Sequence, residues 1–195
     1  MKIGVLAVQG AFIEHEHIIE KIGHEVVEIR QKKDLEGIDG IILPGGESTV
    51  QGQLLRKLDM LDTIKSAIAD GLPTLATCAG LILLSEHIAD DDTVHIGTLP
   101  VTIKRNAYGR QLSSFVTNAD IKHIGNYPMT FIRAPYIENV SDGVEVLASV
   151  DNHIVAAKYN NQIGLSDHTG TFNQLLPFCI RQITGTQMLG IHSGL

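Results

Sequence analysis

The chain has 195 residues, of which 44% are hydrophobic and 19% charged, and its formal net charge is −7. This length is typical of one globular domain with a substantial core, and we expect residues 1–195 to form a single domain. The negative charge argues against nucleic acid or an anionic membrane surface as a partner. Two cysteines make no disulfide framework and no apolar run is long enough to cross a membrane, so a cytoplasmic protein is expected.

The N-terminal half of the chain alternates apolar β-type runs with helical patterns. Strands are predicted at Ile3–Val8, Val26–Ile29 and Gly40–Leu43. Helices are predicted at Ile13–Ile22, ended by Gly23, and at Leu54–Ala69, with a break near Asp59. The run Leu72–Leu84 then indicates a buried strand, a sharp turn at Cys78 and another helix. This alternation predicts an α/β fold with a mostly parallel central sheet flanked by helices.

From about Val101 the pattern changes to short β-type runs. They lie at Met129–Arg133, Val144–Ala148, His153–Lys158 and Gln162–Leu165. These runs indicate a short antiparallel extension of the same domain.

Three segments follow predicted parallel strands, and α/β proteins place their sites at the carboxyl ends of such strands. They are Gln9–Gly10, the turn Pro44–Thr49, and Cys78. The turn Pro44–Thr49 matches neither common phosphate-binding pattern. It has two open interpretations. Ser48 is the N-cap of an ordinary strand-to-helix turn, or Gly45 and Gly46 present backbone N–H groups to a ligand carbonyl while Glu47 and Ser48 hold a polar ligand such as an amino acid.

Cys78 is the candidate nucleophile. The small residues Ala79 and Gly80 leave the backbone around its sulfur uncrowded. The N–H groups that open the following helix are expected to favour the thiolate, and the N–H groups of Gly46 and Ala79 to form an oxyanion hole. The alternative is a buried structural cysteine.

His168 is the candidate base because it follows the apolar run Ile163–Ser166, which places it at the end of a late strand. The alternative is an ordinary loop histidine. His15 and His17 lie two apart on a predicted helix and face different ways, so no metal site is expected there. No cofactor is predicted.

Several short motifs occur in order along the chain. They are Gln9–Gly10, Leu43–Thr49, Gly71–Pro73 with Thr77–Gly80, Lys104–Gln111 and Phe131–Pro135. Over roughly residues 1–168 the chain resembles the glutaminase subunit of pyridoxal 5′-phosphate synthase, a class I (triad-type) glutamine amidotransferase. The last two motifs distinguish this subfamily from other class I glutaminases and argue against another flavodoxin-like cysteine hydrolase, such as a peptidase.

The resemblance implies a flavodoxin-like fold that hydrolyses L-glutamine to L-glutamate and ammonia. The ammonia would pass to a separate synthase subunit that assembles the cofactor, in a hetero-oligomer. The resemblance also implies that Cys78 is the nucleophile and His168 the base. The implied glutamine-binding positions are Gly46, Glu47, Ser48, Arg105, Ile132 and Arg133.

One departure from the family pattern follows His168. The family reads His-Pro-Glu-Leu, and its glutamate orients the imidazole, whereas Thr169 and Gly170 stand at the proline and glutamate positions here. The segment from about residue 169 is therefore atypical. Asp167 is an alternative orienting group, although neighbouring residues in an extended segment point to opposite faces.

Two explanations of this departure remain open. Codons for Thr169–Thr171, read one base later, can spell Pro-Glu-Leu, so a one-base shift would account for the lost glutamate and the unfamiliar tail. Against this, apolar residues keep helical spacing between Phe172 and Ile183. An active glutaminase and a catalytically impaired or silent glutaminase-like binding subunit are therefore both compatible with the sequence.

Overall fold

The computed structural model of the chain describes residues 1–105, 115–131 and 134–167. Its first half contains β1 (Lys2–Leu6), α1 (Ile13–Lys21), β2 (Glu25–Ile29), the 3-10 helix η1 (Lys32–Leu35), β3 (Gly40–Leu43), α2 (Ser48–Lys57), α3 (Leu61–Ala69), β4 (Thr74–Thr77) and α4 (Ala79–Leu84). Its second half contains β5 (Ser85–Ile88), β6 (Leu99–Lys104), β7 (Phe115–Ile121), β8 (Gly125–Phe131), β9 (Tyr136–Val140), β10 (Glu145–Val150), β11 (His153–Tyr159) and β12 (Gln162–Leu165).

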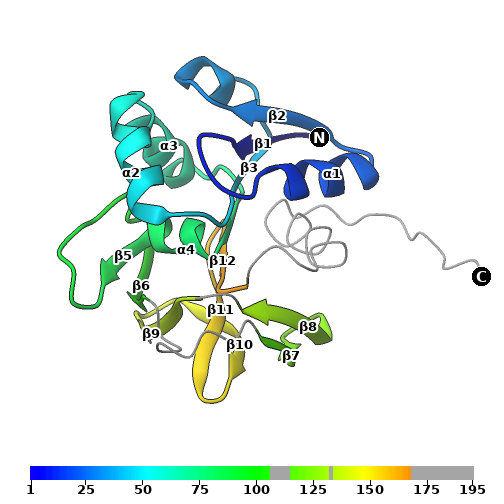
Figure 1. The fold of residues 1–195 in the computed structure, drawn as a ribbon, viewed down its shortest axis with the longest axis vertical. Coiled ribbons are helices and arrows are strands. Elements are labelled where there is room, and N and C mark those ends of the chain that lie inside the picture. The colour runs from blue at the N-terminus through cyan, green and yellow to red at the C-terminus, as the bar shows by residue number, and fades with distance from the viewer. Residues whose placement is uncertain (106–114, 132–133, 168–195) are drawn as a thin grey trace, which may run out of the picture.

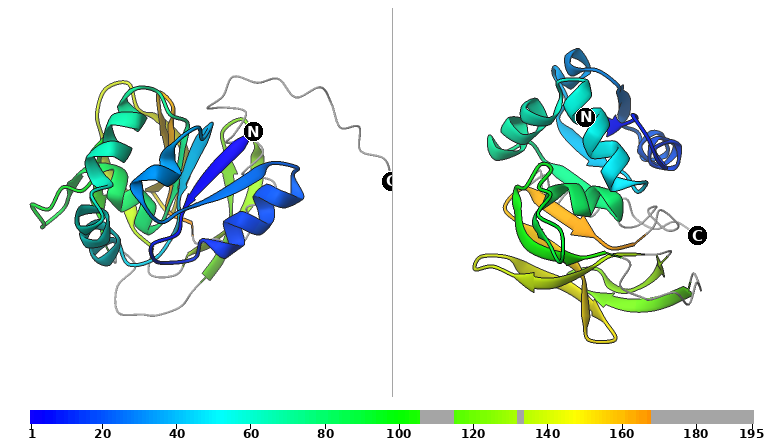
Figure 2. Two further views of the ribbon diagram at one scale, coloured as in Figure 1. Left: turned by 90° about the horizontal axis from the view of Figure 1, so that it is seen from above. Right: turned by 60° about the vertical axis from the view of Figure 1, so that its left-hand side comes forward.

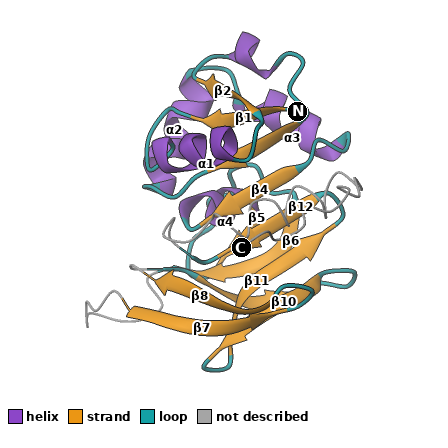
Figure 3. Cartoon of the chain, turned by 90° about the vertical axis from the view of Figure 1, so that its right-hand side faces the viewer, coloured by secondary structure: helices purple, strands orange, loops and turns teal. Residues whose placement is uncertain are grey.

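The central sheet has the strand order β2-β1-β3-β4-β12-β11-β9-β6-β5, with β10 paired to β11 (Figure 1). The strands from β2 to β12 in this order are all parallel. Antiparallel pairs continue the sheet from β12 through β11 and β9 to β6. A separate two-stranded sheet is formed by β7 and β8, and Figure 3 shows it beside the antiparallel part.

Helices cover both faces of the parallel strands. Helices α2 and α3 lie on one face and α1 on the other, as the two views of Figure 2 show. Two apolar cores follow from this arrangement, because successive strand residues point to opposite faces. In β3, Ile42 belongs to the core that contains Ile19 of α1, whereas Ile41 and Leu43 belong to the core beneath α2, α3 and α4.

The predicted mostly parallel sheet is confirmed, and β3 and β12 have the predicted bounds. The break between α2 and α3 is also confirmed, with Asp59 at φ +55°. The predicted helix start at Leu54 is wrong, because α2 already begins at Ser48. Strands β5, β6, β7 and β9 were not predicted, so the antiparallel part is larger than the sequence pattern indicated.

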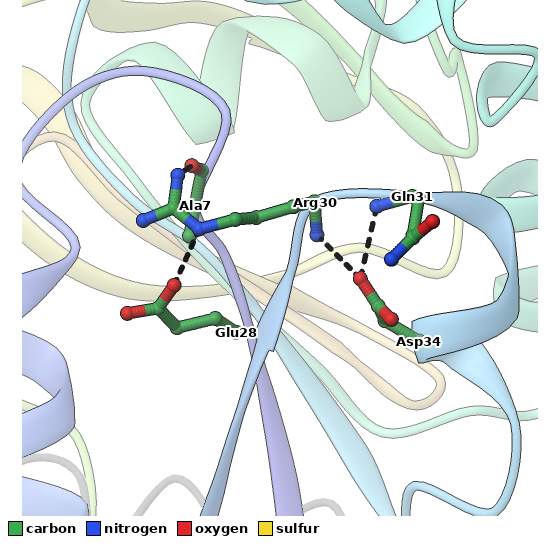
Figure 4. Close-up of polar contacts among 5 residues, drawn as sticks. All are labelled: Ala7, Glu28, Arg30, Gln31 and Asp34. Carbon is green, nitrogen blue, oxygen red and sulfur yellow. Dashed lines mark hydrogen bonds and ion pairs between the residues drawn. The ribbon is translucent and has the colours of Figure 1, made fainter.

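Arg30, which directly follows β2, anchors the loop between β1 and α1 (Figure 4). Its Nη1 donates to the carbonyl oxygen of Ala7 over 2.8 Å, and its Nε pairs with Glu28. Its guanidinium carbon also lies 5.2 Å from the ring centroid of Phe12, within cation–π range. Because Ala7 begins this loop and Phe12 ends it, one side chain holds both ends.

Asp34 in turn fixes the backbone from which Arg30 extends. Its Oδ2 accepts the N–H groups of Arg30 and Gln31 over 3.0 Å each (Figure 4). The loop that carries Gln9 and Gly10 is therefore attached to a turn that is itself hydrogen-bonded.

Candidate active site

Cys78 lies in the turn between β4 and α4 with a strained backbone, at φ +46° and ψ −101°. Residues with a side chain seldom adopt a positive φ, and such strain is typical of functional sites. The Cys78 N–H donates to the carbonyl oxygen of Leu165, at the end of β12, over 2.8 Å. A Cβ on Gly80 would lie only 2.0 Å from the carbonyl oxygen of Leu43, at the end of β3. The ends of β3, β4 and β12 therefore converge on the candidate nucleophile.

Burial raises the pKa of the Cys78 thiol to about 11. A backbone hydrogen bond from Ala79 lowers this pKa, whereas the carboxylates of Asp167 and Glu47 raise it further. The expected preference for the thiolate is therefore wrong for the resting protein, because desolvation outweighs the one helical N–H that reaches the sulfur. The nucleophile must lose its proton to a base before it can attack.

The glycine turn after β3 is braced by the loop after β1. The side-chain oxygen Oε1 of Gln9 accepts the Glu47 N–H over 2.9 Å. The carbonyl oxygen of Gly45 accepts the Ala11 N–H over 3.0 Å. The Gln51 amide Nε2 donates to the carbonyl oxygen of Gln9 over 2.9 Å. These bonds hold the two predicted site segments together in one orientation.

Gly46 is exposed in this turn and has no room for a side chain. A Cβ there would lie 2.5 Å from Gln9 Oε1 and 2.9 Å from Gln51 Nε2. Glu47 is exposed, whereas Ser48 is buried. The helix α2 begins at Ser48 with Glu47 as its N-cap, so the interpretation of Ser48 as the N-cap is wrong. The backbone of Gly46 and Glu47 is open to an approaching ligand.

The end of β12 brings Asp167 into the site. β12 pairs in parallel with β4, with Leu165 opposite Thr77, so the prediction of a late strand beside the nucleophile is confirmed. Asp167 is 1% exposed, and its Oδ1 accepts the N–H of Thr130 over 2.7 Å. His168, the predicted base, follows Asp167 directly and lies outside the described residues.

Arg105 extends from the end of β6 and pairs with Asp91, with 2.9 Å between Nη1 and Oδ2. Its Nε is buried and has no hydrogen-bond partner among the residues that the structure describes. The other predicted glutamine-binding residues beyond β8, Ile132 and Arg133, lie outside the described residues.

Two contributors to the site were not singled out from the sequence. Gln51 is buried on α2 and joins the two site loops. Its spacing of three from Ser48 puts both residues on one helix face, which is a usable signal. Thr130 contributes a backbone N–H, and no property of its side chain indicates this role.

The described part of the chain contains neither a metal-binding cluster nor a membrane-spanning helix. No group of three His, Cys, Asp or Glu residues in it is placed to hold a metal ion. None of its helices has the length and apolar character needed to cross a membrane.

A cysteine at a strained strand-to-helix turn, beside a glycine turn in a mostly parallel sheet, matches the architecture of glutamine amidotransferases. A solved structure titled "Crystal structure of glutamine amidotransferase" superposes with a TM-score of 0.89 at 34% identity, over 94% of this chain and 99% of that chain. A family model described as the SNO glutamine amidotransferase family matches residues 5–180. The chain belongs to this family.

Curated relatives agree with this assignment. A protein of Desulfitobacterium hafniense (strain Y51) is 59% identical over 169 residues, which are 86% of this chain and 85% of the relative. A protein of Haemophilus influenzae (strain PittEE) is 51% identical over 179 residues, 90% of this chain and 93% of the relative. Both are named pyridoxal 5′-phosphate synthase subunit PdxT. The resemblance drawn from the short motifs is therefore confirmed.

Proposed function

We propose that this chain hydrolyses L-glutamine to L-glutamate and ammonia and delivers the ammonia to the synthase subunit of a pyridoxal 5′-phosphate synthase. The observation that carries the proposal is the position of Cys78, in a strained turn where the ends of β3, β4 and β12 meet. Family membership and the names of the curated relatives support the substrate and the pathway.

The first chemical step is attack of the Cys78 sulfur on the carboxamide carbon of glutamine. Because the thiol has a pKa of about 11, a base must take its proton as the carbon–sulfur bond forms. His168 is the residue proposed for this role, one position after Asp167. The N–H groups of Gly46 and Ala79 are proposed to stabilise the oxyanion that develops on the carboxamide oxygen.

The second step releases ammonia and then glutamate. The imidazolium of His168 protonates the departing nitrogen, which leaves a thioester on Cys78, and the neutral imidazole then activates water to hydrolyse that thioester. The zwitterionic end of glutamine needs donors for its carboxylate and an acceptor for its ammonium group. We assign the donors to Arg105 and Arg133, because a guanidinium pairs with a carboxylate bidentately. The segment Gly45–Ser48 and Ile132 complete the proposed binding positions.

Ammonia release measured with the cognate synthase tests the proposal. Cys78→Ala is expected to abolish hydrolysis, and a glutamine-analogue alkylating agent should label Cys78 and spare Cys179. The Cys179→Ala variant is the matched control and should keep its activity. Labelling mainly at Cys179, or undiminished ammonia release by Cys78→Ala, would overturn the assignment.

The proposed partner and compartment of this chain follow from the need to retain the ammonia it produces. A glutaminase that releases free ammonia into solution wastes it, so we propose a hetero-oligomer with the synthase in the cytoplasm. The free thiol of Cys78 is compatible with such a reducing compartment. We propose that residues 1–195 act as one glutaminase domain in this complex.

A further inference from the structure

We propose that Asp167 is a positioning residue whose buried carboxylate ties the segment leading into the base to the segment leading into the glutamine-binding positions Ile132 and Arg133. This inference rests on the glutaminase function proposed above. It assigns a role to a residue that the family pattern around the histidine does not include.

The first segment that Asp167 restrains is the end of β12. The carbonyl oxygen of Leu165 accepts the Cys78 N–H over 2.8 Å, so the backbone is fixed against the nucleophile two residues before Asp167. Asp167 is itself 1% exposed. The next residue in the sequence is His168. A carboxylate held here restrains the chain immediately before the base.

The second segment that Asp167 restrains is the end of β8. Oδ1 of Asp167 accepts the Thr130 N–H over 2.7 Å. Thr130 is the next-to-last residue of β8, and Ile132 and Arg133 follow that strand directly. β8 pairs with β7 in a separate two-stranded sheet, so this hydrogen bond connects that sheet to the end of β12 in the central sheet. A hydrogen bond to a buried carboxylate is stronger than one between neutral groups and fixes its partners more firmly.

The same carboxylate also lies close enough to Cys78 to raise its pKa. Asp167 therefore belongs to the candidate site and also holds the backbone of Thr130 through Oδ1. Among the described residues, the groups that act on the Cys78 thiol are the N–H of Ala79 and the carboxylates of Asp167 and Glu47.

The test compares Asp167→Ala, which removes the acceptor, with Asp167→Asn, which keeps an acceptor oxygen but removes the charge. A matched control is offered by Asp39, whose carboxylate likewise accepts a backbone N–H over 2.7 Å, from Lys2 at the start of β1. Each variant is assayed for ammonia release in complex with the cognate synthase, and thermal unfolding of each checks the fold.

For Asp167→Ala we expect the KM for glutamine to rise about tenfold or more, with a smaller fall in kcat, because a lost hydrogen bond to a charged group costs roughly that factor. The Asp167→Asn variant should have a KM for glutamine close to the wild-type value. Its Cys78 alkylation profile should move to lower pH, a change that a merely structural role would not produce. Asp39→Ala and Asp39→Asn should stay within about twofold of wild type.

A wild-type KM in folded Asp167→Ala would overturn the proposal while leaving the glutaminase function intact. If Asp167→Ala does not fold, Asp167→Asn decides, because unchanged protection of the Thr130 amide against hydrogen exchange in that variant would overturn the tie. If the wild-type chain hydrolyses no glutamine, the function fails and the tie is tested by hydrogen exchange. A fall in protection of the Thr130 amide, partial in Asp167→Asn where a neutral acceptor remains and larger in Asp167→Ala, supports the tie, and unchanged protection in both overturns it.

Discussion

At the scale of single residues, the candidate nucleophile Cys78 is a buried thiol that is protonated in the resting protein. Its pKa is about 11, mainly because desolvation penalises the thiolate. Since a thiol reacts far more slowly than a thiolate, this burial limits side reactions of Cys78 until a substrate and a base are in place. The ionisation state of Cys78 is therefore coupled to assembly of the site.

The alkylation of Cys78 by iodoacetamide should reflect this pKa. For the isolated subunit, we expect the rate at Cys78 to rise about tenfold per pH unit from about pH 7 to 10 without a plateau, because the thiolate fraction grows in that proportion below the pKa. Mass spectrometry of the labelled peptides separates Cys78 from Cys179. A plateau below about pH 8 would show that the thiolate already dominates in the resting protein.

Gly170 stands where the family pattern has the glutamate that orients the histidine. A chain restored to His-Pro-Glu-Leu by T169P, G170E and T171L should release ammonia at least about tenfold, and up to about 10⁴-fold, faster than the chain as written. The reason is that a carboxylate partner holds the imidazole of the base in the correct tautomer. Glutamine binding, measured by calorimetry in a Cys78→Ala background, should change much less. Equal rates would mean that another group orients His168 or that the base is a different residue.

At the scale of elements, α2 is held by an unusually close contact with the segment between β5 and β6. A Cβ on Gly52 would lie 2.0 Å from Nδ1 of His95, and His95 is 4% exposed and cannot move aside into solvent. Arg56, one turn further along α2, donates through Nη2 to the carbonyl oxygen of Val94 over 2.7 Å. Because α2 begins at Ser48 in the glycine turn, this contact also sets the position of the candidate binding loop.

Gly52→Ala should destabilise the protein by about 1–3 kcal/mol, because the added methyl group overpacks a rigid contact. Urea unfolding measures this difference. The neighbouring variant Gln53→Ala is the control, since Gln53 is exposed on the same helix and its replacement should change the free energy of unfolding by no more than about 0.5 kcal/mol. Equal stabilities of the two variants would contradict the close packing of α2 on His95.

His95 should also make stability depend on pH. Burial, followed by the charges of Arg56 and Arg105, lowers the pKa of His95 below its ordinary value of 6.5. The folded state then binds fewer protons than the unfolded state, so the free energy of unfolding falls as the pH drops below about 6.5. Urea unfolding at a series of pH values should show a shallower slope for His95→Gln than for wild type. Identical slopes would exclude this histidine as a source of the dependence.

The sequence predicted the parallel half well because β1, β3, β4 and β12 are almost fully buried and read as largely apolar runs, as in Gly40–Leu43. β9 and β7 were missed because their segments, Tyr136–Val140 and Phe115–Ile121, carry polar residues. β9 also depends for its pairing on β6 and β11, which are distant in the sequence. In the site, the Cys78 turn was predictable from its small neighbours. The raised pKa was not, since it depends on burial and on Asp167 and Glu47, which come from other strand ends.

At the scale of the whole molecule, the two halves of the central sheet meet at β12. This strand pairs with β4 in the parallel half and with β11 in the antiparallel half. It also positions the backbone of Cys78 and leads into Asp167. β12 therefore both joins the two halves of the sheet and leads into the last described part of the candidate site.

Mixing the chain with its cognate synthase should produce a hetero-oligomer and a faster glutaminase rate. The physical reason is that transfer of ammonia without loss requires the two active centres to be joined. Light scattering of the mixture measures the assembly, and ammonia release measures the rate. A version with the restored His-Pro-Glu-Leu tail is the control, and failure of that version to bind would contradict the proposed partnership.

The late place of β12 in the sequence also has a consequence for biosynthesis. A ribosome must add the 161 residues that precede Gln162 before β12 can be made, while the chain folds from its N-terminus as it is synthesised. Until then β4 and β11 are open edges that invite pairing with other nascent chains. Glutamine hydrolysis therefore cannot begin on an incomplete chain, and polypeptides terminated before Gln162 are expected to aggregate and be degraded.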